Sequence, residues 1–503
     1  MYLLDTGWRL KKTASAGEEL FKTIVNNQPL KFSNSFSLWQ KNFTDFKNRI
    51  LEVDRLSRGY LDRKYELRKY LDLIGQINSL LPLIVSQSGQ KTYYVLLQNN
   101  MELRPTGGFM GSYAKLKFQN GSLVETLIQD IYVPDGQITG HVDPPWPIQE
   151  AFKTGFWKLR DANWDPDFPS AAKTIDWFFQ KGKEEKADGM IAINLLTVKK
   201  LLKTVGPLYL SDYKQMVNEG NFYQITQSYT ETDFFAGSTQ KKDILSALGK
   251  AFFEKFKNLS LNQTKNVMEI IYEDLNQRQI LVSFNDPILA GFFSRLGWDG
   301  SMRPVVSSTS QLNDYLYLVE TNLGANKANC CLERKVEQEV NIESRGDIKE
   351  KLKIDYHYQS GFMGEITPIF PGEPYINFLR FYLPEIARLT QIKVDGKAIS
   401  LDKRVYKEEK KELGLRGYGF FVKIAPLAHV TVEVEYELNN SFGQIPPQYR
   451  LLVQKQPGIE SYPLALNLLI DGKHFWREER LIKRDEEIVV DLMYNKSADN
   501  KQK

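Results

Sequence analysis

Cysteine is scarce in this chain of 503 residues, which has two, the neighbours Cys330 and Cys331. They could bridge each other only through a vicinal linkage, and no Cys/His spacing of the metal-binding type accompanies them. The sequence therefore excludes a framework of disulfides and a zinc site built on cysteine. The compartment stays open, because a large domain can be exported without disulfides.

Long hydrophobic runs are also lacking. The nearest approach to the roughly 20 apolar residues of a membrane helix is the stretch from Leu80 to Val85. The start of the chain, Met1 to Asp5, has no apolar core of a signal peptide. We therefore expect this chain neither to span a membrane nor to carry an export signal.

Neither sign of charge dominates. The 66 Lys and Arg against 62 Asp and Glu leave a net charge of +4, spread along the chain rather than gathered in the blocks of a nucleic-acid-binding tail. The charge balance therefore argues against nucleic acid as a partner. The apolar content of 42% is sufficient for more than one core, and the length is typical of two to four domains.

The first part of the chain has a helical pattern. From about residue 36 to residue 81, apolar residues recur at three- and four-residue steps among many charges, with Gly59 as the expected break. The pattern predicts an N-terminal helical arm over residues 1–88. Such an arm could pack on its own domain, or it could serve as a stalk or a pairing helix.

The central part, residues 89–328, alternates short β-type runs with helical ones, which predicts an α/β domain with a mixed sheet. Asn120 and Gly121 are good residues for a hairpin turn. The strands expected here cover 112–118, 123–128 and 189–193, and the helices cover 169–179, 195–205, 241–256 and 263–275.

The last part changes to period two. Apolar residues alternate with polar ones over 352–358 and 430–436, and turn pairs such as Asp395-Gly396 separate the runs. This pattern predicts an all-β, immunoglobulin-like sandwich over residues 329–495. The polar residues 496–503 are expected to be a loose tail.

The candidate chemistry begins with the stretch Arg104-Pro-Thr-Gly-Gly-Phe-Met-Gly111, directly after an apolar run at 93–97. An arginine and free backbone amides at the end of a strand suit a bound anion such as a phosphate. The glycines have an alternative explanation, because glycine alone reaches positive φ without strain in a turn.

A second polar cluster, residues 160–167, lies just before an expected helix, where ligands of open α/β folds collect. Arg160 could clamp a phosphate, while Asp161 and Asp165 could ligate Mg²⁺ or act as a base. The same residue types are also good turn and N-cap residues, so a structural role stays open.

Two further candidates lie between these clusters. Asp130 ends an expected strand, and His141 is the one histidine of the α/β segment and so its one candidate for imidazole chemistry. A loop histidine is more often a surface or packing residue.

These elements resemble the bacterial DUF4012 family, named for a domain of unknown function. They are dispersed over more than 200 residues, which makes the match specific. The resembling stretches are 102–109, 133–136, 140–145, 159–169 and 321–327.

The domain is also similar, more distantly, to the LytR-CpsA-Psr enzymes, which transfer glycopolymers from a polyprenyl-pyrophosphate carrier onto cell-wall acceptors. In those enzymes arginines hold the pyrophosphate, acidic residues hold Mg²⁺, and an aspartate is a proposed base. The resemblance and the polar clusters together predict these site residues: Asp130 and Asp161 as catalytic groups; Arg104, Thr106, Gly107, Gly108, Arg160, Asn163, His141, Lys241 and Lys242 as substrate-binding groups; and Asp130, Asp161 and Asp165 as ligands of Mg²⁺.

Three functions follow as hypotheses. The first is an envelope protein that transfers or binds a polyprenyl-linked glycopolymer, and the second is a non-catalytic surface protein that binds envelope lipid or glycan. The second is favoured by Gln129, which stands where the enzymes have an arginine. The third, a serine enzyme, rests on Ser170 and Lys173 in a Ser-x-x-Lys pair. The resemblance implies an extracytoplasmic, membrane-associated location on a bacterial envelope, with a cell-wall polymer as acceptor.

Overall fold

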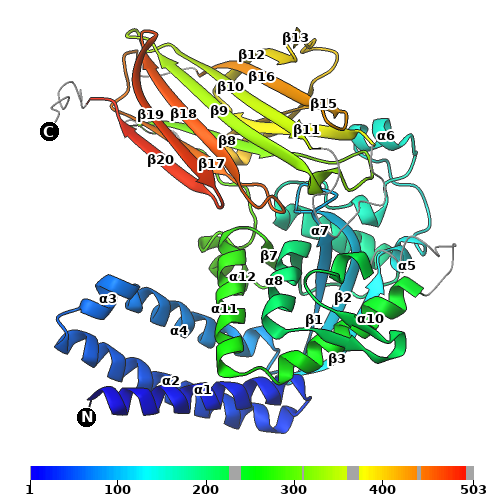
Figure 1. The fold of residues 1–503 in the computed structure, drawn as a ribbon, viewed down its shortest axis with the longest axis vertical. Helices are drawn as coiled ribbons and strands as arrows, with labels where there is room; N and C mark the ends of the chain where they lie inside the picture. The colour runs from blue at the N-terminus through cyan, green and yellow to red at the C-terminus, as the bar shows by residue number, and fades with distance from the viewer. Residues whose placement is uncertain are drawn as a thin grey trace.

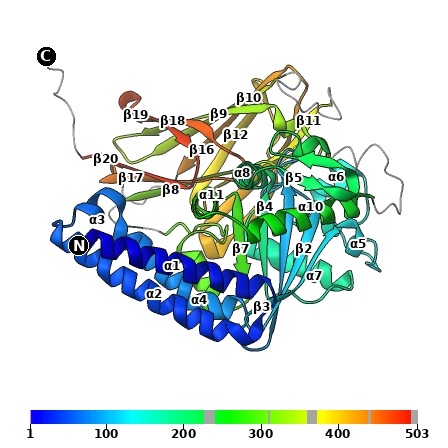
Figure 2. The same ribbon diagram turned by 60° about the horizontal axis from the view of Figure 1, so that its bottom comes forward.

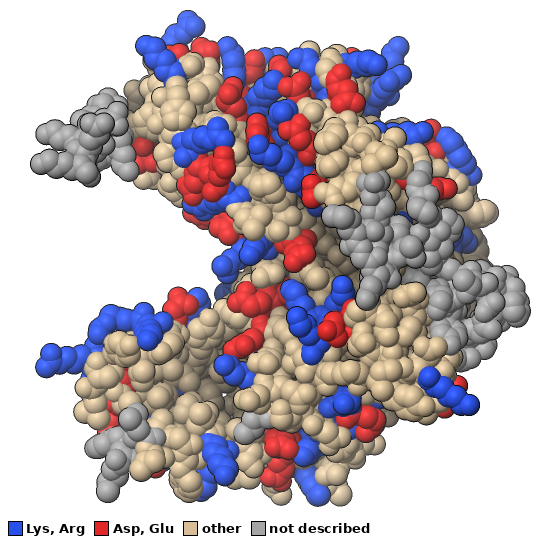
Figure 3. Space-filling view, in the orientation of Figure 1, with Lys and Arg blue, Asp and Glu red and all other residues tan. Residues whose placement is uncertain are grey.

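The protein has a helical arm, an α/β domain and a β-sandwich in that order along the chain (Figure 1). A computed structural model describes residues 2–225, 240–306, 308, 311–359, 373–438 and 443–493. The expected tail at 496–503 lies outside these ranges. The arm and the sandwich both project from the α/β domain, so the molecule is hollowed on one side (Figure 3).

Helix begins at Tyr2, well before residue 36, where the clear apolar pattern of the arm starts. Gly59, the expected break, adopts a φ of +75° between two helices. No helix in the described ranges has the length and apolar character to cross a bilayer. The helices are α1 (Tyr2–Val25), α2 (Pro29–Leu56), α3 (Tyr60–Tyr65) and α4 (Leu67–Ile84).

The inner end of the arm packs on the α/β domain, beside the β3 edge of its sheet (Figure 2). Leu20 and the stacked rings of Phe32 and Phe36 form a small core with Val85 and Phe118. Phe32 lies against the turn at Gly121, where an added Cβ would meet its ring. The arm therefore packs on its own domain at this end, while α3 lies at the free end.

The α/β domain is built on a mixed sheet with the strand order β3-β2-β1-β4-β7. β1 and β4 are parallel, and the other neighbours are antiparallel. Asn120 and Gly121 form the turn of the expected hairpin. The strands are β1 (Gln90–Asn99), β2 (Phe109–Gln119), β3 (Ser122–Asp130), β4 (Gly189–Asn194) and β7 (Ile280–Phe284), with a separate pair β5 (Leu208–Leu210) and β6 (Gln215–Val217).

Helices cover both faces of this sheet. α7 packs on one face, where Tyr94 stacks on Phe179 at a centroid distance of 4.5 Å. α8 and α10 lie over the other face and share a core with α11. The helices are α5 (Tyr132–Asp135), α6 (Trp146–Phe152), α7 (Phe168–Lys181), α8 (Leu195–Val205), α10 (Gln240–Lys257), α11 (Leu261–Asn276) and α12 (Pro287–Arg295), with short 3₁₀ turns η1 (Leu159–Asp161) and η2 (Ser211–Tyr213).

The sandwich consists of a seven-stranded sheet, β13-β12-β16-β10-β9-β18-β19, on a six-stranded sheet, β14-β15-β11-β8-β17-β20. The strands are β8 (Leu312–Val319), β9 (Leu332–Ile342), β10 (Ile348–Tyr358), β11 (Tyr375–Pro384), β12 (Ala387–Val394), β13 (Lys397–Ala398), β14 (Tyr406–Lys410), β15 (Leu415–Ile424), β16 (His429–Leu438), β17 (Gln448–Gln454), β18 (Tyr462–Ile470), β19 (Lys473–Ile482) and β20 (Glu486–Asp491); the 3₁₀ turns are η3 (Ala328–Cys330) and η4 (Lys411–Leu413).

The period-two prediction is confirmed in β10 and β16. Leu352 and Ile354 of β10 and Val432 and Val434 of β16 are fully buried in the core between the sheets. Two features differ from the expectation. The sheets have more strands than an immunoglobulin domain, and β8, which precedes the expected boundary at residue 329, pairs with β11 and β17 of the sandwich.

The α/β domain and the sandwich are joined by buried hydrogen bonds. Nη1 of Arg278 donates to the carbonyl of Lys455, and Nζ of Lys455 donates to the carbonyl of Gln277. Gln456 donates to the carbonyl of Arg104 at 3.1 Å. In the same region the two cysteines, Cys330 and Cys331, form a vicinal disulfide.

Candidate functional site

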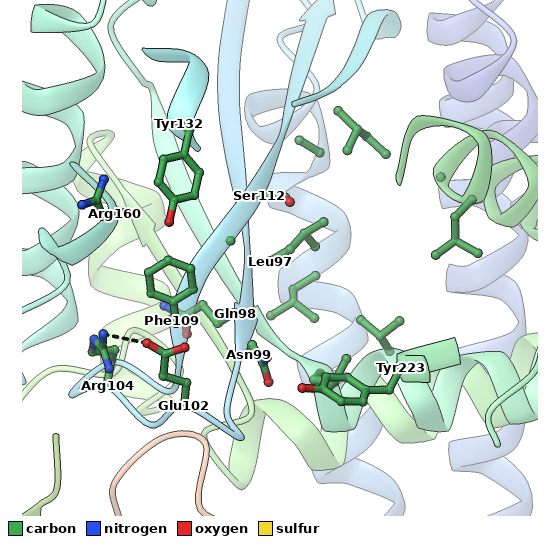
Figure 4. Close-up of a pocket in the computed structure, with 18 of the residues that line it drawn as sticks. Leu97, Gln98, Asn99, Glu102, Arg104, Phe109, Ser112, Tyr132, Arg160 and Tyr223 are labelled. Atoms are coloured by element: carbon green, nitrogen blue, oxygen red, sulfur yellow. Dashed lines mark hydrogen bonds and ion pairs between the residues drawn. The ribbon is translucent and has the colours of Figure 1, made fainter. Parts of the chain in front are cut away.

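A cavity of about 850 Å³ lies between the sheet and helices α8 and α10, and the loop after β1 opens onto it (Figure 4). Its size is within the range of cavities that hold one small-molecule ligand. Its walls come from segments that are far apart in the sequence, since β1, β3, β4, α8, α10 and the loops after β1 and α6 all contribute.

Most of the cavity wall is apolar. The apolar side chains come from the sheet face opposite α7, from the inner faces of α8 and α10, and from α6 and nearby segments. They include Leu97, Phe109, Ile128 and Ile193 of the strands; Leu195, Val198, Leu201 and Leu202 of α8; Leu248, Phe252 and Phe253 of α10; Phe152 of α6; and Phe156 and Phe222 outside these elements.

One end of the cavity is charged, and Arg104 is its centre. The side chain is 3% exposed, and its Nη2 donates to Glu102 at 3.0 Å and to Asp161 at 3.4 Å. Nη1 donates to the backbone carbonyl of Asn322. Nε is buried and has no hydrogen-bond partner among the residues that the structure describes.

A second arginine lies beside this group. Arg160, in the middle of the short turn η1, donates from Nη1 to the buried carboxylate of Asp135 at 3.0 Å and lies 3.8 Å from Asp161. Asp135 also accepts the backbone amide of Leu159, which fixes the loop that carries Arg160. The guanidinium is centred 5.0 Å from the ring of Tyr132. In Figure 4 Arg104, Arg160 and Tyr132 lie on one side of the pocket, away from Tyr223.

The charges at this end form a chain of alternating sign. Lys327 contacts the second oxygen of Glu102 at 3.0 Å, so the order is Lys327, Glu102, Arg104, Asp161, Arg160 and Asp135. Three cations and three carboxylates balance. Lys158 also lines the cavity and adds a further positive charge to its wall.

Asp161, one carboxylate of this ion-pair network, lies in surroundings that oppose its ionisation. Burial raises the pKa of Asp161 above its ordinary value, although Arg104 and Arg160 act to lower it. Desolvation therefore outweighs the attraction of two guanidinium groups. A buried carboxyl with a raised pKa in a cavity is a candidate proton donor or acceptor.

The other predicted residues of the first motif hold the bend in place. Thr106 is fully buried, and its hydroxyl accepts from Gln98 and from Asn163. Gly107 has a φ of +132°, and an added Cβ would lie 2.6 Å from Oε1 of Gln98. Gly108 is packed against the backbone of Asn99. None of Thr106, Gly107, Gly108 and Asn163 lines the cavity.

Replacing Gly107 by alanine should lower the free energy of unfolding by about 1–3 kcal/mol, because a side chain is strained at this φ and would also meet Gln98. Urea denaturation measures the change. Gly396→Ala is the matched control, because Gly396 has a φ of +72° and open space around its Cβ position. An equal loss in both variants would show that close packing at Gly107 contributes nothing.

Asp130, Asp165 and His141 do not line the cavity. Asp130 is buried at the end of β3, where its carboxylate accepts the amide of Tyr132. Asp165 pairs with Lys410 of the sandwich at 2.9 Å, and exposed His141 contacts Asp143 at 2.7 Å.

The remaining predicted groups lie elsewhere. Lys241 and Lys242 belong to the first turn of α10, and their side chains lie outside the described part of the chain. Ser170, the serine of the Ser-x-x-Lys pair, lies in the first turn of α7, where the N-cap Asp167 accepts both its amide and its hydroxyl. In the described residues no three His, Cys, Asp or Glu side chains are grouped to hold a metal ion.

Besides Asp135 and Lys158, the charged residues Glu102 and Lys327 of the site were absent from the predicted set. Both stand at the ends of stretches that carry the family resemblance, which is the signal that could have found them. The sequence analysis also did not predict the apolar wall of the cavity. The adjacent aromatic residues Phe252 and Phe253 in the α10 segment are a signal for it, because they widen the apolar face of that helix.

Comparison with protein families gives one match. Residues 88–230 match the model of the family described as "Protein of unknown function (DUF4012)", which supports the resemblance seen in the motifs. The match includes β1 to β4, Arg104, Arg160 and Asp161, and therefore the charged end of the cavity except Lys327. No curated protein matches the chain.

Solved structures resemble parts of the chain only remotely. A Legionella pneumophila protein provisionally described as nutrient binding shares 9% identity over 30% of this chain and 54% of its own, with a TM-score of 0.20. The M1 zinc metallopeptidase of Deinococcus radiodurans shares 7% identity over 27% and 32%, with a TM-score of 0.13. Yeast LTA4 hydrolase shares 8% over 27% and 23%, with a TM-score of 0.15. The matched region thus spans about half, or less, of the length of each of these proteins.

Proposed function

We propose that the α/β domain binds an amphiphilic lipid, with the apolar chain in the cavity and an anionic headgroup at Arg104 and Arg160. The observation that carries the proposal is the division of one cavity into a long apolar wall and a compact charged end. A polyprenyl phosphate or pyrophosphate, the carrier class implied by the resemblance to LytR-CpsA-Psr enzymes, has both parts.

The apolar wall supports the lipid chain. Cavity walls built from leucine, isoleucine and phenylalanine gain free energy when an apolar chain displaces water from them. The wall is closed on one side by the sheet and on the other by α8 and α10. A rigid polar ligand such as a free sugar would leave its hydroxyl groups without partners on this surface, which is costly.

The charged end supports an anionic headgroup. Buried Nε of Arg104 has no acceptor in the described part of the chain, and an unmade hydrogen bond of a buried donor is costly. Arg160 is partly exposed, and Lys158 adds charge that the chain of paired groups does not neutralise. A phosphate oxygen would find a planar donor and two neighbouring cations there.

Transfer of the lipid-linked group is the second candidate function. It is favoured by Asp161, which lies between two arginines on the cavity wall and has a raised pKa. The protein ligands do not fit the expected Mg²⁺, because Asp130 and Asp165 do not line the cavity and Glu102 is already paired with Lys327 and Arg104. No step is therefore assigned to a metal. Transfer of a labelled glycan from its lipid carrier, lost in Asp161→Asn, is the test of this candidate.

Binding of an envelope lipid would place the protein on a bacterial envelope, with the extracytoplasmic face and a cell-wall polymer acceptor as further parts of the same proposal. The sandwich would then present the acceptor or a partner protein. Lipid extraction and mass spectrometry after purification in mild detergent would identify the bound class.

Binding should be measured by calorimetry with farnesyl phosphate and farnesol. Val198→Trp, which fills the cavity, should weaken both at least tenfold, whereas Lys203→Trp on the exposed side of α8 should not. Lys158→Gln should weaken farnesyl phosphate alone by about tenfold, because a charge-assisted contact is lost. Lys153→Gln, in the same loop but outside the cavity wall, is its control.

The two parts of the proposal fail separately. Unchanged binding in Val198→Trp would place the ligand outside the cavity. Equal affinity for farnesol and farnesyl phosphate would remove the headgroup site while leaving the apolar site.

A further inference from the structure

The free end of the helical arm, residues 55–70, concentrates positive charge. We call it the arm tip; it includes the last turn of α2, the whole of α3 and the start of α4. It carries six Lys and Arg against two Asp and Glu, a net of four positive charges. That equals the net charge of all 503 residues, so the rest of the chain is neutral as a whole.

The acidic side chains of the tip, and Asp54 directly before it, are paired with groups of the tip itself. Asp54 is fully buried, accepts the amide of Asp62 and pairs with Arg68. Asp62 in turn accepts the amide of Arg68 at 2.8 Å. Glu66 pairs with Lys69. The carboxylates thus fix the two turns around α3 and leave little negative charge on the outer surface.

The unpaired cations point outward. Arg55, Arg58, Arg63 and Lys64 are exposed and form no ion pair with any described residue. Figure 3 shows blue side chains gathered as a patch at the free end of the arm. Four unpaired cations on one small end form an anion-binding surface suited to many weak contacts rather than to one pocket.

Apolar side chains share this surface with the cations. Leu56, Tyr60 and Tyr65 are 60%, 50% and 55% exposed. Nζ of Lys64 lies 5.5 Å and 5.2 Å from the two tyrosine ring centroids. Tyrosine is enriched where one end of the ring is apolar and the other is wet, as at the headgroup level of a bilayer.

We propose that the arm tip docks on a membrane surface of anionic lipids. Arg and Lys would contact the headgroup phosphates, while Leu56, Tyr60 and Tyr65 would enter the interface beside them. A soluble polyanion would satisfy the cations but would leave these three apolar groups in water. The combination therefore favours lipid, and it does not depend on what the cavity binds.

The test uses the full chain and vesicles of phosphatidylcholine with and without about 30% phosphatidylglycerol, the anionic component. A variant with Arg55, Arg58, Arg63 and Lys64 all changed to serine should lose at least about thirtyfold in partitioning to the anionic vesicles. The matched control changes the exposed, unpaired Lys397, Lys403, Arg404 and Lys483 of the sandwich, which alters the net charge equally. It should bind like the wild type.

A second variant separates the apolar contribution. Tyr60→Ser with Tyr65→Ser should weaken vesicle binding several-fold at constant charge. The proposal is overturned if the tip variant binds anionic vesicles as well as the sandwich control does, or if phosphatidylcholine alone binds the wild type equally. Binding to soluble polyphosphate as tight as to vesicles, and unaffected by the tyrosine changes, would assign the tip to a polyanion instead.

Discussion

Arg104→Met should destabilise the protein by about 3–5 kcal/mol, because the substitution leaves buried carboxylates without their shared cation. Glu102 and Asp161 are 4% and 8% exposed, and both contact Nη2 of Arg104. Methionine retains much of the volume of the arginine stem and removes only the guanidinium. The free energy of unfolding from urea denaturation measures the loss.

The matched control is Arg345→Met, which removes an 86% exposed guanidinium and should change stability by less than about 0.5 kcal/mol. Adding Asp161→Asn to Arg104→Met should recover part of the loss, since one uncompensated charge disappears with it. A loss below about 1 kcal/mol in Arg104→Met, with no recovery in the double variant, would show that the buried network adds little to stability.

The sequence predicted the elements of the fold from local patterns, and the structure agrees with most of them. The hairpin at Asn120 and Gly121 and the alternating burial of β10 depend on turn chemistry and on period two, which are visible within ten residues. The early start of the sandwich at β8 was not visible in this way. The apolar run of β8 suits either domain, and its pairing with β11 and β17 is set by residues more than 50 positions away.

The candidate site was also predicted only in part, because local patterns do not reveal partners that lie far away in the sequence. Arg104 and Arg160 both contact Asp161, because the loops that carry these residues belong to one α/β domain. Asp165 was expected to ligate a metal because it belongs to a polar cluster just before a helix, but it pairs with Lys410, which lies 245 residues further along the chain. A polar residue at a domain boundary has partners that no local pattern reveals.

Two acidic side chains lie inside the sandwich core. Asp314 of β8 and Glu350 of β10 are 1% and 3% exposed, and Gln338 donates to both. Tyr449 donates to Asp314, and Tyr436 donates to Glu350. Burial raises the pKa of Asp314 from 3.8 to about 6, and burial together with the charge of Asp314 raises the pKa of Glu350 well above its ordinary value.

This pair should make the stability of the sandwich fall as the pH rises. Because both pKa values are raised, the folded protein holds these protons more tightly than the unfolded chain does. The stabilising contribution is therefore complete below about pH 4 and declines as the pH rises toward the folded-state pKa values; the part from Asp314 is lost by about pH 6, and the part from Glu350 is lost at higher pH. Since a tenfold change in proton affinity is worth about 1.4 kcal/mol, roughly 3 kcal/mol should be lost on the titration of Asp314.

Glu350→Gln should flatten this profile and raise the free energy of unfolding at pH 8 by about 1–3 kcal/mol, because glutamine keeps a hydrogen-bond donor toward Asp314 without requiring a proton. Urea denaturation of the wild type and the variant between about pH 4.5 and pH 8 measures both effects. Glu412→Gln, on the exposed turn η4, is the control and should run parallel to the wild type. If Glu350→Gln also runs parallel, the two carboxyl groups do not share a proton in the folded sandwich, and its pH dependence has another origin.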